Sequence, residues 1–385
     1  MLHRFTVLNL VLSVMVLAGC ANSSGLSTEP VEKRSEAVAA TPERFTRFFG
    51  WGNLRDEATS QMFQDLGVTD VTVRDEKQIE LANRFGMKPY LPAGGKGRYA
   101  QKITVAQEQF QRQLNGDWLP PLEKNATAAQ KQQRREEIAA YRRSIQYRWG
   151  DAPEAGSSPE EVLPQSILCF LGPDNLQLAL DDIDQKARIP GLAGFSLDYI
   201  GYTNYRGCYC DACLGRLQAY LHQHQLKDTP ANRDTFYLQE LIDYNNALVR
   251  HVKAINPNLK VMAHIYPVFL PQPLYGNRLM IDFCGQTVAW YFPWDESKIR
   301  SYSRNVVGQQ HRYHSGVRGI PFMGYYQESV DFPKKDAYRV ELELRAILES
   351  GSDILMVYNI NHVLRDPEVT AVFKKYCAPA VATEH

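Results

Sequence analysis

The sequence has no excess of charge of either sign, because 43 Lys and Arg residues balance 43 Asp and Glu residues. Without a basic field the chain has little attraction for a nucleic-acid backbone, which argues against a nucleic-acid-binding protein. Two catalytic signatures are also absent. The glycines at 94, 95 and 97 match neither nucleotide fingerprint, and no nucleophile elbow or Ser-His-Asp motif is visible. These absences disfavour nucleotide-binding and serine-hydrolase functions.

Long hydrophobic runs are scarce, and the one near the N-terminus is short. Residues 5–16 form an apolar run behind the positive start Leu2-His3-Arg4. A run of this length suits the core of a signal peptide and is too short to span a bilayer. It ends in Leu17-Ala18-Gly19-Cys20, which resembles the lipobox of bacterial lipoproteins. No other run is long enough to cross a membrane.

The lipobox resemblance implies a signal peptide over residues 1–19 and a lipoprotein acylated at Cys20, with palmitate-type chains as the membrane anchor. Because no aspartate follows Cys20, the resemblance favours the outer membrane of a bacterial cell envelope over the inner one. The alternative is an ordinary secretory signal in which Cys20 has no role. Residues 20–42 are small and polar, which predicts a flexible tether.

From residue 43 to residue 385, short apolar runs alternate with amphipathic helical stretches. The predicted strands cover residues 48–53, 68–75, 87–95, 191–201, 260–268, 286–294, 320–329 and 352–362. Strands that alternate with helices are typical of parallel βαβ units. Eight such units predict an α/β fold, the (β/α)₈ TIM barrel. An open doubly wound sheet is the alternative, and the missing phosphate loop disfavours it.

A long insertion, residues 96–164, follows the third predicted strand. It is rich in Gln, Arg, Lys and Glu, and its pattern predicts helices over 104–114 and 126–147. One interpretation is a solvated excursion on the surface. The other is a lid, because loops that follow barrel strands lie on the catalytic face.

Three cysteines, Cys208, Cys210 and Cys213, follow the fourth predicted strand within six residues. Thiolates at this spacing can wrap a tetrahedral metal ion, which needs a fourth ligand. The segment GCYCDACLGRLQAYL resembles the zinc-binding segment of glycoside hydrolase family 42 β-galactosidases. In that family the fourth ligand is an upstream cysteine, so the resemblance implies structural zinc held also by Cys169. Disulfides in an oxidising compartment are the alternative. Cys284 and Cys377 are expected to be buried thiols.

The resemblance also bears on catalysis. Asp198 follows the apolar run GFSL, at a strand end where catalytic residues of such barrels gather. The family has its general acid/base at this place, and the resemblance implies the same role for Asp198. The family pattern there is Asn-Glu, whereas this chain has Leu197-Asp198, which is closer to glycosidase-like barrels that have Leu-Asp-Tyr.

Glycoside cleavage needs a second carboxylate, and Glu328 at the end of the seventh predicted strand supplies one. Alternative roles are a hydrogen-bonding group at a strand end for Asp198 and a surface carboxylate for Glu328. Asp75 and Asp295 are further candidates, for which structural roles are favoured.

Aromatic and amide side chains gather at the predicted strand ends, where they could stack on sugar rings and bind hydroxyl groups. The candidate substrate-binding residues are Trp51, Asn53, Tyr199, His264, Tyr266, Trp290, Tyr291, Tyr326, Tyr358 and Asn359. Together with the carboxylates they predict a glycoside hydrolase-like enzyme that cleaves an oligo- or polysaccharide and needs no organic cofactor. The alternatives are a catalytically inactive glycan-binding barrel, and a lyase or hydrolase of another kind that acts on a small molecule.

Overall fold

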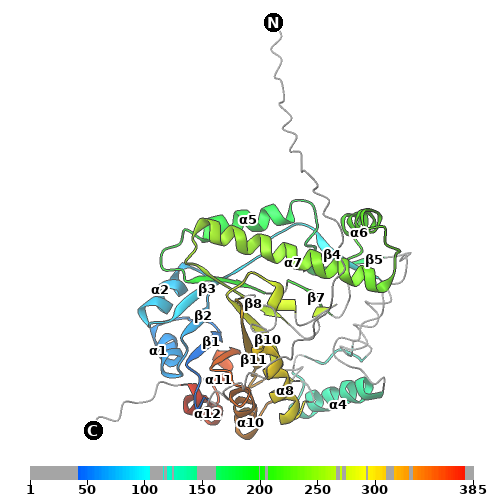
Figure 1. Cartoon of the computed structure of the whole chain (residues 1–385). Coiled ribbons are helices and arrows are strands. Elements are labelled where there is room, and N and C mark those ends of the chain that lie inside the picture. The colour runs from blue at the N-terminus through cyan, green and yellow to red at the C-terminus, as the bar shows by residue number, and fades with distance from the viewer. Residues whose placement is uncertain are drawn as a thin grey trace, which may run out of the picture. The chain divides into compact units, whose positions relative to one another are not determined.

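The computed structural model describes residues 42–104, 116, 119–123, 125–144, 162–198, 200–203, 207–265, 269–270, 275–291, 294–308, 316–328 and 333–377. Within them, parallel strands close into a barrel in the order β1-β12-β11-β10-β8-β6-β3-β2. Figure 1 shows several of these strands side by side in the middle of the molecule. Every predicted strand contributes one of these eight strands. The predicted TIM barrel is therefore confirmed.

Each strand overlaps its predicted run but ends before it. The barrel strands are β1 (Arg47–Trp51), β2 (Asp70–Thr72), β3 (Lys88–Ala93), β6 (Gly194–Leu197), β8 (Lys260–Ile265), β10 (Phe283–Ala289), β11 (Arg318–Gly324) and β12 (Ile354–Tyr358). For β6, β8, β10 and β11 the predictions ran on because aromatic and apolar residues continue in the sequence soon after the strand ends. The loops that follow the strands lie at the carboxyl end of the barrel, which is the catalytic end in this fold.

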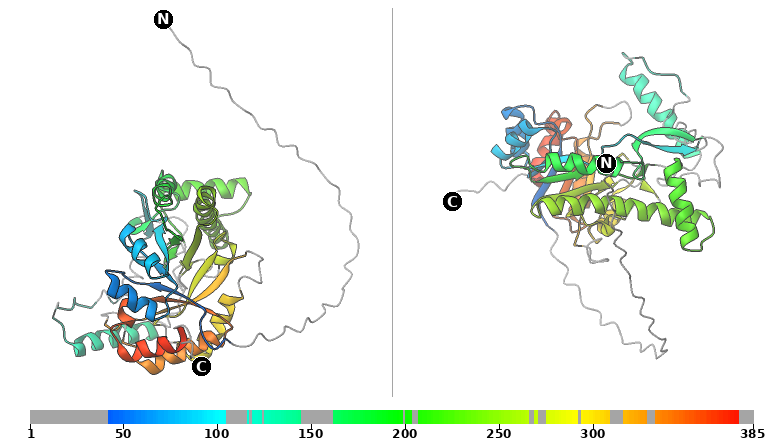
Figure 2. Two further views of the ribbon diagram at one scale, coloured as in Figure 1. Left: turned by 90° about the vertical axis from the view of Figure 1, so that its left-hand side faces the viewer. Right: turned by 90° about the horizontal axis from the view of Figure 1, so that it is seen from above.

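Helices surround the barrel, as the two views in Figure 2 show. They are α1 (Glu57–Asp65), α2 (Glu76–Arg84), α5 (Asn175–Lys186), α6 (Asp211–Gln223), α7 (Pro230–Ile255), α8 (Glu296–Val307), α10 (Ala337–Leu348), α11 (Ile360–Val363) and α12 (Pro367–Cys377). The Asp75 and Asp295 side chains accept hydrogen bonds from the N–H groups of Gln78 and Lys298 and so cap α2 and α8. The structural roles favoured for these two aspartates are thus observed.

The inside of the barrel is packed with large side chains. Alternate residues of a strand face the same side, and the inward positions carry Phe49, Trp51, Tyr90, Met262, Phe283, Ile320, Phe322, Ile354 and Met356. Near the amino ends of the strands, Arg47 donates to both carboxylate oxygens of the fully buried Asp70, at 2.6 and 2.8 Å. The interior is therefore a solid core, and it leaves the carboxyl end as the place for a site.

The region between β3 and α5 contains more than helix. β4 (Ala100–Thr104) pairs antiparallel with β5 (Val162–Leu168), and α4 (Ala128–Ser144) lies between them in sequence. The helix falls inside the predicted stretch 126–147, but the two strands were not predicted. A second short pair joins β7 (Tyr202–Thr203) to β9 (Phe269–Leu270), and the 3₁₀ helix η1 (Tyr275–Arg278) follows.

Some predictions fall outside the described residues. They are the signal peptide, the lipidated Cys20, nearly all of the tether, residues 105–114 of the helix predicted over 104–114, Tyr199 and Tyr266. The first residue of that predicted helix, Thr104, is instead the last residue of β4. In the part of the chain that is described, no helix is both long and apolar enough to cross a bilayer.

Candidate functional site at the barrel mouth

Asp198 lies at the carboxyl end of the barrel, immediately after β6. Leu197 pairs with Ala263 of β8, so Asp198 and His264 are the next residues along the two strands. The Asp198 Oδ1 atom lies 3.7 Å from His264 Nδ1, and the Asp198 side chain is 29% exposed. This carboxylate therefore faces both the buried imidazole and the solvent at the mouth.

His264 has no exposed side-chain surface. Its ring centroid lies 3.8 Å from that of Phe322 and 5.0 Å from that of Trp51, and its Nε2 lies 2.8 Å from Thr287 Oγ1. Burial lowers the pKa of His264 below its ordinary value, an effect that the Asp198 carboxylate opposes. Burial of this ring therefore favours its neutral form.

A cluster of half-buried aromatic side chains lies beside this pair. Ring centroids are separated by 5.8 Å for Trp290 and Tyr326, 6.1 Å for Trp290 and Tyr358, and 5.7 Å for Tyr326 and Tyr358. The Tyr326 N–H donates to the Tyr291 hydroxyl at 2.6 Å. Trp51, predicted to bind substrate, is buried and packs on Tyr358 at 6.2 Å, so it supports the cluster from below. The structure thus brings five predicted residues together.

The two predicted asparagines hold loops in place. Asn53 Oδ1 accepts a hydrogen bond from Gln78, and the Asn53 N–H donates to Asn361 Oδ1. Asn359 caps α11 by accepting from the Asn361 N–H. Both asparagines are partly exposed, but the oxygen atom of each is engaged within the protein.

Glu328 lies farther out than predicted. The seventh barrel strand, β11, ends at Gly324, so Glu328 belongs to the following loop, where it is exposed. The neighbouring Gln327 N–H donates to His362 Nδ1 at 3.2 Å. Burial and the charge of Arg365 lower the pKa of His362, and the charge of Glu328 opposes them. Glu328 is therefore a carboxylate on the rim, beside His362.

Trp290 and Tyr291 also line a cavity of about 320 Å³. Beneath it, the buried Lys335 donates to the carbonyl oxygens of Ala289 and Gly324, each at 3.0 Å, and to Glu343 at 2.7 Å. Lys335 thereby joins the ends of β10 and β11, from which the aromatic cluster extends. The remaining lining residues are Trp294, Pro333, Lys334, Asp336, Arg339 and Glu343, so neither Asp198 nor Glu328 lines this cavity.

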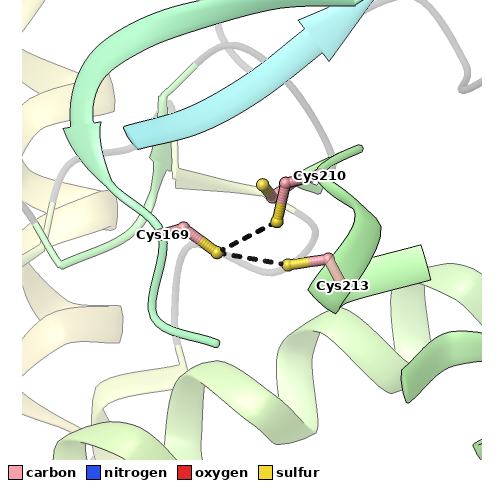
Figure 3. A group of neighbouring side chains, drawn as sticks. Cys169, Cys210 and Cys213 are labelled. Carbon is pink, nitrogen blue, oxygen red and sulfur yellow. Dashed lines mark hydrogen bonds between the residues drawn. The ribbon is translucent and has the colours of Figure 1, made fainter. Parts of the chain in front are cut away.

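The four cysteines form a second candidate site. Cys169 follows β5, Cys208 and Cys210 precede α6, and Cys213 lies in its first turn. Their sulfur atoms all lie within 4.8 Å of one another. Cys169 Sγ lies 3.4 Å from the sulfur atoms of both Cys210 and Cys213 (Figure 3), too far for a disulfide bond of about 2.05 Å.

The geometry of this cluster fits a metal ion. Four sulfur ligands at about 2.3 Å from a tetrahedral zinc are separated from one another by about 3.8 Å, close to the observed spacing. Hydrogen bonds among the neighbouring thiols lower the pKa of Cys169 and Cys210 and raise the pKa of Cys208 and Cys213, so the support for a metal comes from the positions of the sulfur atoms. Cys284 and Cys377 are buried elsewhere, as expected, and burial raises the pKa of Cys284 to about 12. The cysteine cluster can therefore hold a metal.

Two contributors to the mouth were not found from the sequence. Thr287 has no motif around it, although it lies two residues beyond Gly285, which pairs with His264. Lys335 lies in a loop, and its partner Glu343 lies eight residues away in α10. Alternation along β10 could have indicated Thr287, whereas no local signal indicated Lys335.

Solved structures with a similar fold include two β-galactosidases. That of Bacillus circulans sp. alkalophilus aligns with a TM-score of 0.53 and 12% identity over 86% of this chain and 56% of its own. A catalytic mutant of Gan42B, a GH42 β-galactosidase from G. stearothermophilus, aligns with a TM-score of 0.51 and 10% identity over the same shares, 86% and 56%.

This chain thus spans just over half the length of those two proteins. The sequence matches no protein-family model and no curated protein. At identities this low the likeness concerns the fold alone, and on that ground the chain has the TIM-barrel fold that these β-galactosidases share.

Proposed function

We propose that this protein is a glycoside hydrolase-like enzyme that cleaves an oligo- or polysaccharide, with Asp198 as its general acid/base. The observation that carries the proposal is the position of the Asp198 carboxylate. It is partly exposed at the end of β6 and faces a buried imidazole at 3.7 Å. The half-buried rings of Trp290, Tyr326 and Tyr358 lie at the carboxyl ends of β10, β11 and β12, on the same end of the barrel, where aromatic faces could stack on a sugar.

In this proposal the two carboxylates divide the reaction between them. Asp198 protonates the leaving glycosidic oxygen, and Glu328 attacks the anomeric carbon or activates a water molecule. Because Glu328 is exposed in a loop beyond β11, its side chain must turn toward the mouth when substrate binds. Trp290 and Tyr326 then hold the sugar ring between the two carboxylates.

The proposed metal is a structural zinc ion at Cys169, Cys208, Cys210 and Cys213. Four thiolates fill the coordination shell and leave no position for a substrate or a water molecule, which separates this site from the chemistry. The ion would fasten the segment after β5 to the beginning of α6. It would thereby steady the loop that leaves β6 just beyond Asp198.

The proposed location is the bacterial cell envelope, with a lipid anchor at Cys20 and the outer membrane favoured. An anchored glycosidase would meet its carbohydrate there. Replacement of Cys20 by Ala should move the protein from the membrane fraction to the soluble fraction after cell lysis. Retention of the variant with the membranes would refute the anchor.

Hydrolysis tests the activity. The wild type is assayed against 4-nitrophenyl glycosides of the common hexoses, including the β-D-galactoside, and against envelope polysaccharides by release of reducing ends. Asp198→Asn should lower turnover by about 10²–10⁴-fold. The matched control is Glu368→Gln, at an exposed carboxylate of α12, which should leave turnover unchanged. An Asp198→Asn variant with wild-type turnover would remove Asp198 from the mechanism.

One observation favours a second candidate, a catalytically inactive glycan-binding barrel. Glu328 is exposed on the rim instead of following the strand end directly. An inactive barrel would bind an oligosaccharide from the same panel in a calorimetric titration, without releasing reducing ends. Turnover by the wild type would exclude this candidate.

A further inference from the structure

Three neighbouring strands of the barrel, β6, β8 and β10, align polar side chains at their carboxyl ends. Asp198 follows β6, His264 lies in β8 and Thr287 lies in β10. His264 and Thr287 are 2% and 1% exposed, whereas the Asp198 side chain is 29% exposed. The line of polar groups therefore begins in the core and ends at the mouth.

We propose that His264 is a positioning residue for Asp198, and that the Thr287 hydroxyl fixes the imidazole tautomer that presents Nδ1–H to the carboxylate. This inference rests on the proposed function, since it concerns the geometry of the proposed general acid/base. It assigns His264 a role behind the site, where the sequence had indicated contact with substrate.

The tautomer follows from the two neighbours of the ring. A neutral imidazole has one N–H group and one acceptor nitrogen. An unprotonated Nδ1 would direct its lone pair at Asp198 3.7 Å away. That arrangement is repulsive when the carboxyl is ionised, as it is once Asp198 has given its proton to the leaving oxygen. With the proton on Nδ1, the ring attracts the carboxylate, and Nε2 accepts a hydrogen bond from the Thr287 hydroxyl at 2.8 Å.

The ring has little freedom to leave this orientation. Phe322 lies against it with centroids 3.8 Å apart and an interplanar angle of 30°, and Trp51 contacts it edge-on at 5.0 Å. The N–O distance of 3.7 Å exceeds that of a hydrogen bond. A small rotation of the partly exposed Asp198 side chain closes that gap, as catalytic hydrogen bonds do when substrate binds.

Thr287 is the residue that tests the proposal most cleanly. Thr287→Val removes the hydroxyl while keeping the branched shape, so Nε2 loses its donor and the Nε2–H tautomer becomes populated. The expected result is a fall in kcat of about tenfold or more with KM unchanged, because orientation is lost and binding is retained. Thr287→Ser restores the hydroxyl and should return kcat toward the wild-type value.

The control is Thr72→Val in β2, which removes a hydroxyl that has no hydrogen-bond partner among the described residues. It should leave kcat unchanged on the same 4-nitrophenyl glycoside. If Thr287→Val lowers the melting temperature but keeps the wild-type kcat, the hydroxyl is only structural and the proposal is overturned.

A second readout needs no substrate. Nitrogen-15 NMR of the free wild-type protein distinguishes the two imidazole tautomers, and His264→Phe, which fills the same space between Phe322 and Trp51, identifies the His264 signals by their loss. The proposal requires Nδ1–H in the wild type and a shift toward Nε2–H in Thr287→Val. A wild-type Nε2–H tautomer would overturn it. Full activity of Asp198→Asn would instead overturn the proposed function, so the two failures are distinguishable.

Discussion

Lys335 and Glu343 form an ion pair of 2.7 Å in which both side chains are buried, directly beneath the aromatic cluster of the mouth. Arg339 shares the Glu343 carboxylate at 2.8 Å and donates to the carbonyl of Trp294. Burial lowers the pKa of Lys335, and the charge of Glu343 opposes this effect. The pair connects α10 with the ends of β10 and β11.

Replacement of Lys335 by Met should destabilise the fold by about 3–5 kcal/mol. The substitution removes one member of a buried ion pair and leaves two buried carbonyl oxygens without their hydrogen-bond donor. Urea unfolding measures this loss. The control is Lys375→Met, at an exposed lysine paired with Glu341, which should leave the free energy of unfolding nearly unchanged. Equal effects of the two substitutions would contradict the role given to Lys335.

Gly324 gives a test of the aromatic cluster. A Cβ atom on Gly324 would lie 2.2 Å from the Trp290 ring, so Gly324→Ala must displace the indole. If Trp290 stacks on the sugar, KM should rise about two- to tenfold, the equivalent of one lost aromatic contact. Gly95→Ala is the control, because its Cβ meets nothing within 4 Å. An unchanged KM for Gly324→Ala would remove Trp290 from the proposed binding site.

The cysteine cluster predicts a metal content. Purified protein should contain about one equivalent of zinc by mass spectrometry, and Cys213→Ser should lose most of it. Cys284→Ser makes the same change at a buried thiol outside the cluster and should keep the zinc. Zinc far below one equivalent in the wild type, with the four thiols oxidised, would favour disulfides instead.

Asp282 predicts a pH dependence of stability. Partial burial would raise the pKa of Asp282, but hydrogen bonds from Lys253, the Val261 N–H and Lys260 outweigh it and hold the pKa below 3.8. A carboxyl whose folded-state pKa is lowered stabilises the protein above its unfolded pKa, and this stabilisation is lost as the pH falls through the folded value. Asp282→Asn should therefore cost stability at pH 7 and progressively less below about pH 4. Urea unfolding of the wild type and the variant, at pH 7 and below about pH 4, measures this loss of stability. An equal loss at both pH values would contradict the prediction.

The fold could be predicted from the sequence because each strand is an apolar run and helical patterns separate the runs. The ends of several strands could not be predicted, because the residues that follow them are of the same apolar and aromatic types as the residues within them. Tyr325 and Tyr326 made the seventh strand appear to reach Ser329, whereas β11 ends at Gly324. That difference moved Glu328 from the strand end to the rim.

The candidate site could be predicted from the sequence only where its residues lie close together along the chain. Cys208, Cys210 and Cys213 indicated a metal by spacing alone, while Cys169 needed a family resemblance, and the structure brings all four together. The contact between Asp198 and His264 depends on the register of β6 and β8. Sequence periodicity does not define that register, so their pairing became visible only in three dimensions.

The central claim is that Asp198 and Glu328 flank a scissile glycosidic bond. A crystal structure of Asp198→Asn with a bound oligosaccharide measures the separation of the two carboxyl carbons most directly. We expect a separation of about 5–5.5 Å for a retaining enzyme or about 6.5–9.5 Å for an inverting one, with the glycosidic oxygen between the two carboxyl groups. A bound sugar with the Glu328 carboxyl still pointing to solvent, well beyond this range from residue 198, would exclude Glu328 as the second carboxylate.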